Sequence, residues 1–529
     1  MHLLQAQAGG ISDGSEAVDL GQRPGEIVVL SAADTELAGL AAARAQFGEA
    51  FPSLRLANLM QLSHNLSVDL YVEQVIANAK LVIVRLLGGE SYWPYGVEQV
   101  AAACRARGIA LALLPGDDQP DAQLTARSTL DAEALHRLWQ FGVHGGPENA
   151  RNFLAYGAHL IGRDMDWREP RPILRAGLYR PGLAEPRLQD IRAQWQADAP
   201  IAALVFYRAL VQAGNLAAVD ALIEALRGEG INPLPLYVSS LKEPLSAETL
   251  AQVFADARPR LVLNATGFAV STPGAARRDG PFDALDCPVL QVVFAGGTHE
   301  AWQNGTQGLS ARDLAMNVAL PEVDGRVLSR AVSFKAEQRF DAVTQCALAT
   351  YAPVQDRIAF VAQLAAHWLK LARTSAQDRK VALVLANYPN RDGRIGNGVG
   401  LDTPAGTLNV LRALQDAGYD TGALPKHGDA IVTRLLEGPT NAMIRARRIE
   451  ETLPRPDYEF FFGALPQSLQ DAVIARWGPP ETDPFYMPGE LDCGAFAIPA
   501  FRLGKVVVGL QPARGYNIDP QASYHDPAL

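Results

Sequence analysis

Short apolar runs alternate with segments of helical periodicity along most of this sequence, and this alternation limits the folds open to it. Between residues 24 and 146, apolar runs at 26–31, 53–59, 81–86 and 109–114 are typical of buried strands. Residues at helical spacing lie between them, at 35–47, 68–77 and 97–107. Because strands joined by helices pair in parallel through right-handed crossovers, we expect residues 24–146 to form a first α/β domain.

The same alternation returns after a helical connection that starts at Pro147. Strands are expected at 202–207, 233–239, 260–266 and 289–294, with helices at 216–228 and 247–256. Residues 147–340 therefore read as a helical connection and a second α/β domain. A helix at 354–374 lies within a helical connector that we place at 341–379.

Residues 380–529 are expected to start a third α/β domain, and residues 1–23 to form an N-terminal extension. The third domain has a strand at 381–386, a helix at 404–417 and a β-hairpin formed by 495–502 and 505–510 around Leu503-Gly504. The predicted fold class is multidomain α/β, with successive parallel-sheet units, helical connectors and this late hairpin. Because no closing helix or strand follows the hairpin, we expect the sequence to be part of a longer protein.

Composition excludes several classes of function. The formal net charge of -10, without a stripe of Lys and Arg, argues against a nucleic-acid partner. No apolar run approaches the roughly 18 residues that a membrane span requires. No basic segment followed by an apolar stretch opens the chain, so a cytoplasmic location is expected. The four cysteines form no CxxC pair, which argues against a disulfide framework or a thiolate zinc site.

The loop that follows the strand at 381–386 is the first candidate site. It contains Gly393, Gly396, Gly398 and Gly400, whose backbone N–H groups could cradle a carboxylate or phosphate beside a helix N-terminus. The spacing matches neither GxGxxG nor the P-loop, so ATP is not expected to bind here directly. Asp402 and Thr403 are interpreted as helix-capping residues. Arg391 and Arg394 are not needed for capping, and guanidinium groups bind anions well.

The loop that follows the last strand is the second candidate. It holds Arg514, Tyr516, Asp519, Tyr524, His525 and Asp526. His525 could be a metal ligand or a proton acceptor, with Asp519 or Asp526 fixing its tautomer, or it could be an ordinary solvated residue. No HxxxH or HExxH pair is present in the sequence, so no preformed multi-ligand metal site is visible.

Three further loops leave alternatives open. Tyr92, Trp93 and Tyr95 follow the strand at 81–86 and could stack on a flat ligand or pack against a neighbouring domain. The loops at 264–267 and 295–300 are interpreted mainly as tight turns. His299 or Glu300 facing a ligand is the other possibility at the second of these loops.

In three stretches the sequence resembles the large subunit of the aerobic-pathway cobaltochelatase, the CobN type, which is related to the magnesium chelatase H subunit. The stretches are Leu86 to Gly89 with Tyr92 to Gly96, Ala386 to Asn390 through Leu401 to Ala405, and Gln511 to Tyr516 through Ser523 to Pro527. The resemblance covers nearly the whole chain and is looser at about 190–380. The family's chains are much longer, and their His-Gly-x-Leu-Glu-x-x-Pro-Gly-Lys motif is absent here, so we expect the N-terminal portion of such a subunit, inactive alone.

The resemblance implies a ligase that forms nitrogen–metal bonds, inserting cobalt(II) into hydrogenobyrinic acid a,c-diamide in aerobic cobalamin biosynthesis. It also implies ATP, with magnesium, hydrolysed by two smaller partner subunits that carry an AAA-type motor. Arg391, Arg394 and Arg514 would then pair with the corrin carboxylates, and His525, with Asp519 or Asp526, would contact cobalt or accept a proton. The other residues expected to bind substrate are Asn390, Asn397, Gly398, Tyr516 and Tyr524.

Two alternatives to this function stay open. The chain could be a non-catalytic docking and substrate-sequestering fragment of that subunit. It could also be a magnesium chelatase H-like subunit that acts on protoporphyrin IX. The strings Asn390-Arg391-Asp392 and Tyr524-His525-Asp526-Pro527 resemble the cobalt branch and argue against the second alternative.

Overall fold

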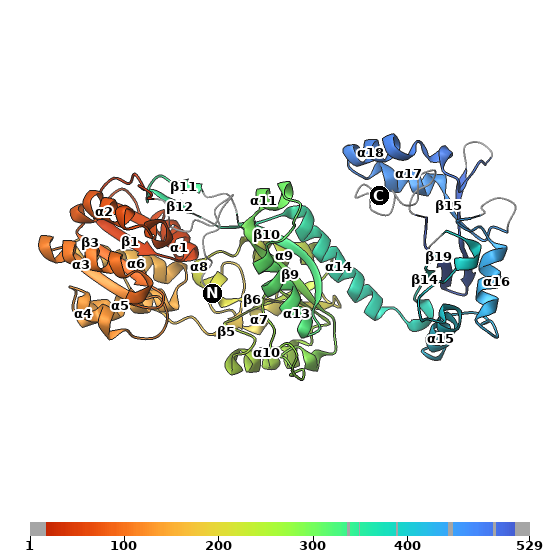
Figure 1. Ribbon diagram of the computed structural model, residues 1–529. Helices are drawn as coiled ribbons and strands as arrows, with labels where there is room; N and C mark the ends of the chain where they lie inside the picture. Colours follow the sequence, from red (N-terminus) through yellow and green to blue (C-terminus); the bar gives the residue numbers. More distant parts are fainter. Residues whose placement is uncertain are drawn as a thin grey trace. The chain divides into compact units, whose positions relative to one another are not determined.

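The structure is a computed structural model that describes residues 17–335, 339–348, 350–387, 390–442, 448–489 and 494–513. It divides into two compact units, residues 1–369 and 370–529. Among the described residues, the first unit contains two large sheets and a two-stranded one, and the second unit contains two sheets of three strands each. The predicted class, multidomain α/β with parallel sheets, is confirmed (Figure 1).

The first sheet has four parallel strands in the order β2-β1-β3-β4. These are β1 (Ile27–Ser31), β2 (Leu54–Asn58), β3 (Leu81–Leu86) and β4 (Ala110–Pro115). Nearly all their residues are buried because helices cover both faces of the sheet. All four predicted strands are confirmed to within one residue at either end.

Six helices flank the first sheet. They are α1 (Asp34–Arg44), α2 (Asn65–Gln74), α3 (Pro94–Arg107), α4 (Ala122–Arg127), α5 (Ala132–His144) and α6 (Pro147–Leu160). Apolar residues of α2 and α3 pack on one face of the sheet, and those of α1, α5 and α6 pack on the other. The predicted helical connection after Pro147 is therefore a layer of this sheet. Short 3-10 turns lie at η1 (Leu59–Leu62), η2 (Ile76–Asn78) and η3 (Glu90–Tyr92).

The second sheet has seven strands in the order β13-β10-β9-β8-β6-β7-β5. They are β5 (Ala176–Leu178), β6 (Ile201–Tyr207), β7 (Asn232–Val238), β8 (Leu261–Asn264), β9 (Val289–Thr298), β10 (Val327–Lys335) and β13 (Tyr351–Pro353). The central five are parallel, and the edge strands β5 and β13 are antiparallel. The four predicted strands are confirmed, but β5, β10 and β13 were not predicted.

The helices around the second sheet follow the same two-sided arrangement. They are α7 (Leu188–Arg192), α8 (Arg208–Ala213), α9 (Ala217–Gly228), α10 (Pro244–Ala257), α11 (His299–Asn304), α12 (Ala311–Asp313), α13 (Leu320–Val323) and α14 (Gln355–Arg373), with a π-helical turn at Leu314–Ala319 and a 3-10 turn at Asp283–Leu285. Helix α14 confirms the helix predicted at 354–374. Its residues Ile358, Val361 and Ala365 pack into the core of the second sheet, so this helix is part of that core as well as a connector.

A short hairpin returns from the second sheet to the first. Strands β11 (Arg339–Asp341) and β12 (Cys346–Leu348) pair antiparallel, where the sequence predicted only a helical connector. Cys346 packs into the core beside the first sheet. The Gln22 amide donates to the carbonyls of Leu56 and Gln345 at 2.8 and 2.6 Å. These contacts tie the two sheets of the first unit together.

The second unit is built on a sheet of three strands in the order β14-β19-β18. These are β14 (Val381–Leu385), β18 (Ala500–Leu503) and β19 (Val506–Leu510), with β14 parallel to β19 and β18 antiparallel to it. Helices α15 (Thr403–Asp416) and α16 (Asp429–Glu437) cover one face. Val384 points away from them and is 63% exposed, so the described residues leave part of the other face uncovered.

The predicted late hairpin is half right. Strands β18 and β19 form it, but residues 495–498 leave that pairing as β17 (Ala495–Ile498). Strand β17 joins β15 (Glu451–Pro454) and β16 (Tyr486–Met487) in a separate antiparallel sheet. Helices α17 (Arg455–Gly463) and α18 (Gln467–Trp477) accompany this sheet, and 3-10 turns lie at Ala376–Asp378, Asp392–Arg394 and Pro480–Thr482. A break at Pro499 explains the division, because proline cannot donate a ladder hydrogen bond.

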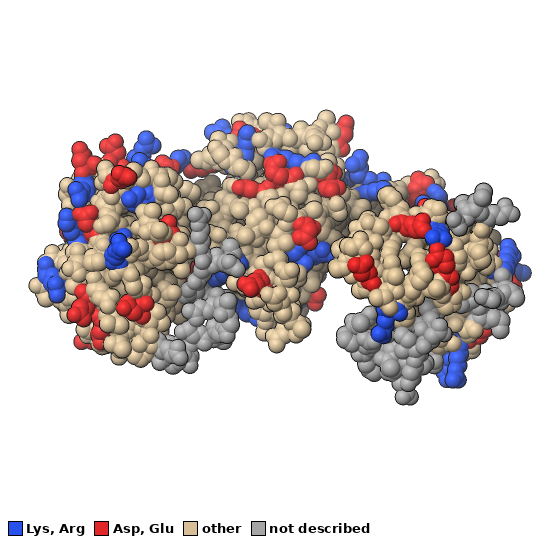
Figure 2. Space-filling model, turned by 90° about the horizontal axis from the view of Figure 1, so that it is seen from above, with Lys and Arg blue, Asp and Glu red and all other residues tan. Residues whose placement is uncertain are grey.

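Charge is spread evenly over the surface that can be seen. Figure 2 shows acidic and basic side chains interspersed on the face viewed from above, with no basic stripe. Within the described residues, no helix is both long enough and apolar enough to cross a bilayer.

Candidate functional site

The candidate site lies at the carboxyl ends of β14 and β19. The two strands pair in parallel from Val381 with Val506 to Leu385 with Leu510, so the loops after them leave from the same edge. The Gln511 N–H donates to the Leu385 carbonyl at 2.8 Å and extends the pairing into the loop. For the described residues, the two loops therefore begin at one sheet edge. Such an edge is where open α/β sheets bind ligands.

The loop after β14 folds back on its own strand. The Gly396 N–H donates to the Ala386 carbonyl at 2.7 Å, and Asn387 pairs with Ile395 in an isolated antiparallel bridge. Ile395 is buried in the core between the sheet and α15, and so anchors the loop. Gly396 has a φ of +68°, which L side chains rarely adopt. The predicted cap is also confirmed, because the Asp402 Oδ1 accepts from the Ala405 N–H at 3.0 Å.

The two predicted arginines of this loop project into solvent. Arg391 and Arg394 are exposed, as are Asn390 and Asn397, and Gly398 is half-buried. Among the described residues, neither arginine has an ion pair. Asp392, which lies between them, is held instead by the Thr440 hydroxyl, which donates to its Oδ1 at 2.7 Å. Both guanidinium groups therefore remain available to an anion outside the fold.

Two buried amides at this edge were not predicted. Asn387 is 3% exposed, and neither its Oδ1 nor its Nδ2 has a hydrogen-bond partner among the described residues. Asn441 donates through Nδ2 to the Gln511 carbonyl at 2.8 Å, while its buried Oδ1 has no partner in the same part of the chain. Unpaired buried amides are costly and uncommon. An asparagine directly after an apolar run was the only sequence signal for Asn387, and it does not reveal burial.

The second predicted loop lies outside the described residues. It contains Arg514, Tyr516, Asp519, Tyr524, His525 and Asp526, together with the proposed metal contact of His525. In the part of the chain that is described, no cluster of three His, Cys, Asp or Glu side chains could hold a metal ion.

Of the other candidate loops, one contributes a side chain to a domain core and another lines a cavity. Trp93 is 7% exposed in the core of its own domain, and its Nε1 donates to the Leu62 carbonyl at 2.8 Å, so it is available neither to a ligand nor to a neighbouring domain. The tight turn predicted at 295–300 is wrong, because β9 continues to Thr298 and α11 begins at His299. His299 and Glu300 line a cavity of about 470 Å³, where His299 packs against Trp302 and Phe334.

Comparison with known proteins places this architecture in a defined class. The chain belongs to the CobN/Magnesium Chelatase family, whose pattern matches residues 139–529. Within the family it is 48% identical to the aerobic cobaltochelatase subunit CobN of Sinorhizobium sp and 44% identical to that of Pseudomonas aeruginosa. Both alignments cover 100% of this chain and 42% of the relative, so the chain spans about two fifths of their length.

A more distant relative and a solved structure also match this chain. The magnesium-chelatase H subunit of Rhodobacter capsulatus is 26% identical over 74% of this chain and 33% of its own length. The catalytic subunit of cobaltochelatase from Mycobacterium tuberculosis superposes with a TM-score of 0.72 at 32% identity. That match covers 95% of this chain and 40% of the solved one.

Proposed function

We propose that the chain forms part of the large, substrate-binding subunit of an ATP-dependent cobaltochelatase. The reaction would insert cobalt(II) into hydrogenobyrinic acid a,c-diamide in aerobic cobalamin biosynthesis. The observation that carries the proposal is the 44–48% identity to CobN subunits along the full chain, against 26% over part of it to a magnesium-chelatase subunit.

The edge of β14 and β19 supports a role in holding the macrocycle. The substrate carries peripheral carboxylates, and a guanidinium without an internal partner can give a carboxylate two charge-assisted hydrogen bonds. In this proposal Arg391, Arg394 and Arg514 pair with the carboxylates. Their neighbours Asn390, Asn397, Gly398, Tyr516 and Tyr524 complete the contact surface.

Metal insertion requires two further steps, and we assign both to the loop after β19. Water must be removed from the cobalt ion, and two protons must leave the pyrrolic nitrogens. His525, oriented by Asp519 or Asp526, would contact the metal or accept a proton. The energy would come from ATP, with magnesium, hydrolysed by two smaller subunits with an AAA-type motor. Consistent with this division, the sequence contains no P-loop pattern.

Binding of hydrogenobyrinic acid a,c-diamide to the 529-residue chain tests the proposal. Titration followed by tryptophan fluorescence should give saturable quenching, and the Arg391→Ala, Arg394→Ala double variant should bind roughly tenfold to hundredfold more weakly. Arg412→Ala is the matched control, because Arg412 is an exposed arginine of α15 in the same unit. Equal affinity of the double variant and the control would refute the assigned roles.

The same titration separates the alternative functions. Protoporphyrin IX binding more tightly than the corrinoid would favour a magnesium chelatase H-like subunit. A docking segment without substrate contact predicts no binding of either tetrapyrrole, together with retained assembly with the motor subunits. Replacement of His525 by Ala should change metal insertion by the assembled enzyme while leaving corrinoid affinity nearly intact.

A further inference from the structure

A crevice lies at the carboxyl edge of the first sheet, in the first unit of the chain. In the order β2-β1-β3-β4, the helices after β1 and β3 cover opposite faces, so the topological switch point falls between these two strands. Ser31 at the end of β1 and Arg85 in β3 are paired in register there. Doubly wound sheets bind ligands at such a point.

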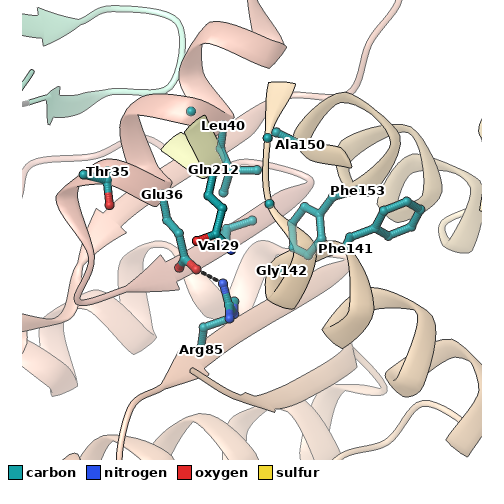
Figure 3. Close-up of a pocket in the computed structure, with 13 residues that line it drawn as sticks. Val29, Thr35, Glu36, Leu40, Arg85, Phe141, Gly142, Ala150, Phe153 and Gln212 are labelled. Atoms are coloured by element: carbon teal, nitrogen blue, oxygen red, sulfur yellow. Dashed lines mark ion pairs between the residues drawn. The ribbon is translucent and has the colours of Figure 1, made fainter. Parts of the chain in front are cut away.

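An ion pair between Arg85 and Glu36 forms the floor of this crevice. The Arg85 side chain is 6% exposed and pairs with Glu36 (Figure 3). The Glu36 carboxylate also accepts from the Ser31 hydroxyl at 2.6 Å. A Cβ at Gly142 would lie 2.6 Å from the Arg85 Cζ, so this position of α5 needs glycine to make room for the guanidinium. The buried Arg85 Nε has no hydrogen-bond partner among the residues that are described. The ion pair leaves this floor neutral overall.

Two adjoining cavities open above the floor. The inner one, about 50 Å³, is walled by Val29, Leu40, Phe141, Ala150 and Phe153, and Figure 3 shows both rings on the side away from Glu36. The outer one is about 410 Å³ and extends to α8. They share lining residues, namely Thr35, Glu36, Arg85, Gly142, Gly145 and Gln212. Together they have the size and the mixed lining of a small-molecule site.

One charge in the outer cavity lacks a counter-ion. The half-buried Arg208 donates through Nε and Nη2 to the carbonyls of Leu174 and Ile173, each at 2.9 Å. Among the described residues no carboxylate pairs with it. The other two arginines that line the outer cavity are paired: Arg85 with Glu36, and Arg175 with Asp118 at 3.3 Å and Glu243 at 2.8 Å. A partly desolvated guanidinium bound only to neutral oxygens favours an anion.

We propose that this crevice binds a small monocarboxylate with a short apolar branch. The carboxylate pairs with Arg208, and the branch enters the inner cavity beside Phe141 and Phe153. A singly charged ligand fits better than a phosphate dianion because three carboxylates, Glu36, Asp117 and Asp118, also line the walls. The site is built from residues of the first unit alone, and the proposal does not depend on the function proposed for the edge of β14 and β19.

Calorimetric and thermal-shift titrations of the 529-residue chain test the proposal with sodium isovalerate, sodium acetate and inorganic phosphate at constant ionic strength. Isovalerate should bind saturably and more tightly than acetate, and acetate more tightly than phosphate. Arg208→Gln should weaken isovalerate binding at least about tenfold, and Arg208→Lys should weaken it less. Ala150→Leu, which fills the inner cavity, should remove the preference for isovalerate over acetate. Arg192→Gln, a surface arginine paired with Asp256, is the control.

Three results would overturn the proposal. The first is no saturable binding of isovalerate or acetate up to about 10 mM, a concentration that covers weak specific sites. The second is unchanged isovalerate binding in an Arg208→Gln variant whose circular dichroism and melting temperature match the parent. The third is phosphate that binds as tightly as isovalerate, which would show a simple anion site without an apolar pocket.

Discussion

Two asparagines at the carboxyl ends of parallel strands have opposite surroundings in the two units. Asn264, the last residue of β8 in the first unit, is fully buried, and its amide donates to the Thr266 carbonyl and to the Gln291 Oε1. Its Oδ1 accepts from the Thr266 hydroxyl at 2.9 Å. Asn387, just beyond β14 in the second unit, is almost as buried, and its side-chain amide has no partner within the ranges that the structure describes.

The amino ends of the sheets do not show this difference. In the first unit Glu26, just before β1, pairs with Lys80 at 2.9 Å and Arg163 at 2.8 Å. In the second unit Asp378, just before β14, pairs with Lys505 at 2.7 Å. Both units therefore close the amino edge with ion pairs, whereas only the first unit satisfies its buried amide at the carboxyl edge. We infer that the carboxyl edge of β14 and β19 is shaped for something other than stability.

The largest effect is expected at a buried ion pair of the first unit. Lys335 lies 3.2 Å from the Asp34 carboxylate, both are almost fully buried, and Asn58 at the end of β2 donates to the same carboxylate at 2.7 Å. Burial raises the pKa of Asp34 against the opposing effect of Lys335. Lys335→Met leaves this carboxylate unpaired, so the free energy of unfolding of the first unit should fall by about 3–5 kcal/mol.

Hydrogen exchange measured by mass spectrometry in denaturant reports the two units separately by peptide. The control is Lys505→Met, which removes a surface ion pair of the second unit and should cost less than about 1 kcal/mol. A similar loss in both variants would mean that the first unit does not depend on its buried pair.

A matched pair of substitutions tests the two asparagines directly. Asn264→Leu leaves the Thr266 and Gln291 polar atoms with fewer partners, so it should destabilise the first unit by about 2–3 kcal/mol. Asn387→Leu removes two unpaired polar atoms and should stabilise the second unit by about 1 kcal/mol. The same exchange experiment measures both changes. Destabilisation by Asn387→Leu of the size seen at Asn264 would show that the amide is structural after all.

The sequence predicted the parallel core well because buried strands carry strong local signals. The run at 81–86 coincides with β3, and the run at 354–374 matches α14 within one residue. Strand β10 was missed because its first four residues, two apolar and then two polar, form neither a continuous apolar run nor a strict alternation, and they are at least partly exposed. Strands β5 and β13 have three residues each, too few for a periodic pattern.

The candidate sites depended on contacts that no local pattern contains. Arg391 and Arg394 could be singled out because a helix cap does not need them, and they are indeed exposed. Among the described residues, Asn387 lacks hydrogen-bond partners and Arg208 lacks a carboxylate partner, and both depend on which distant segments approach them. For the crevice of the first unit one signal was present, since Arg85 is the only charged residue in an otherwise apolar strand. A buried charge in such a strand indicates a paired or functional group.

The smallest predicted effect concerns the amino edges, where the two units should behave alike. Lys80 and Arg163 lower the pKa of Glu26 from 4.5 to about 2. A lowered pKa means that the ion pair stabilises the fold above about pH 4.5 and that this contribution is lost as the pH falls towards 2. Glu26→Gln should therefore lower the free energy of unfolding by about 1 kcal/mol at neutral pH, allowing for solvent screening, and by nothing at pH 2.

In the second unit Lys505 likewise lowers the pKa of Asp378. Asp378→Asn should therefore reduce the loss of stability that the second unit shows as the pH falls. Urea unfolding at several pH values measures how the free energy of unfolding of each unit changes with pH. A Glu26→Gln variant whose stability changes with pH as the parent's does would show that this amino edge contributes nothing to acid sensitivity.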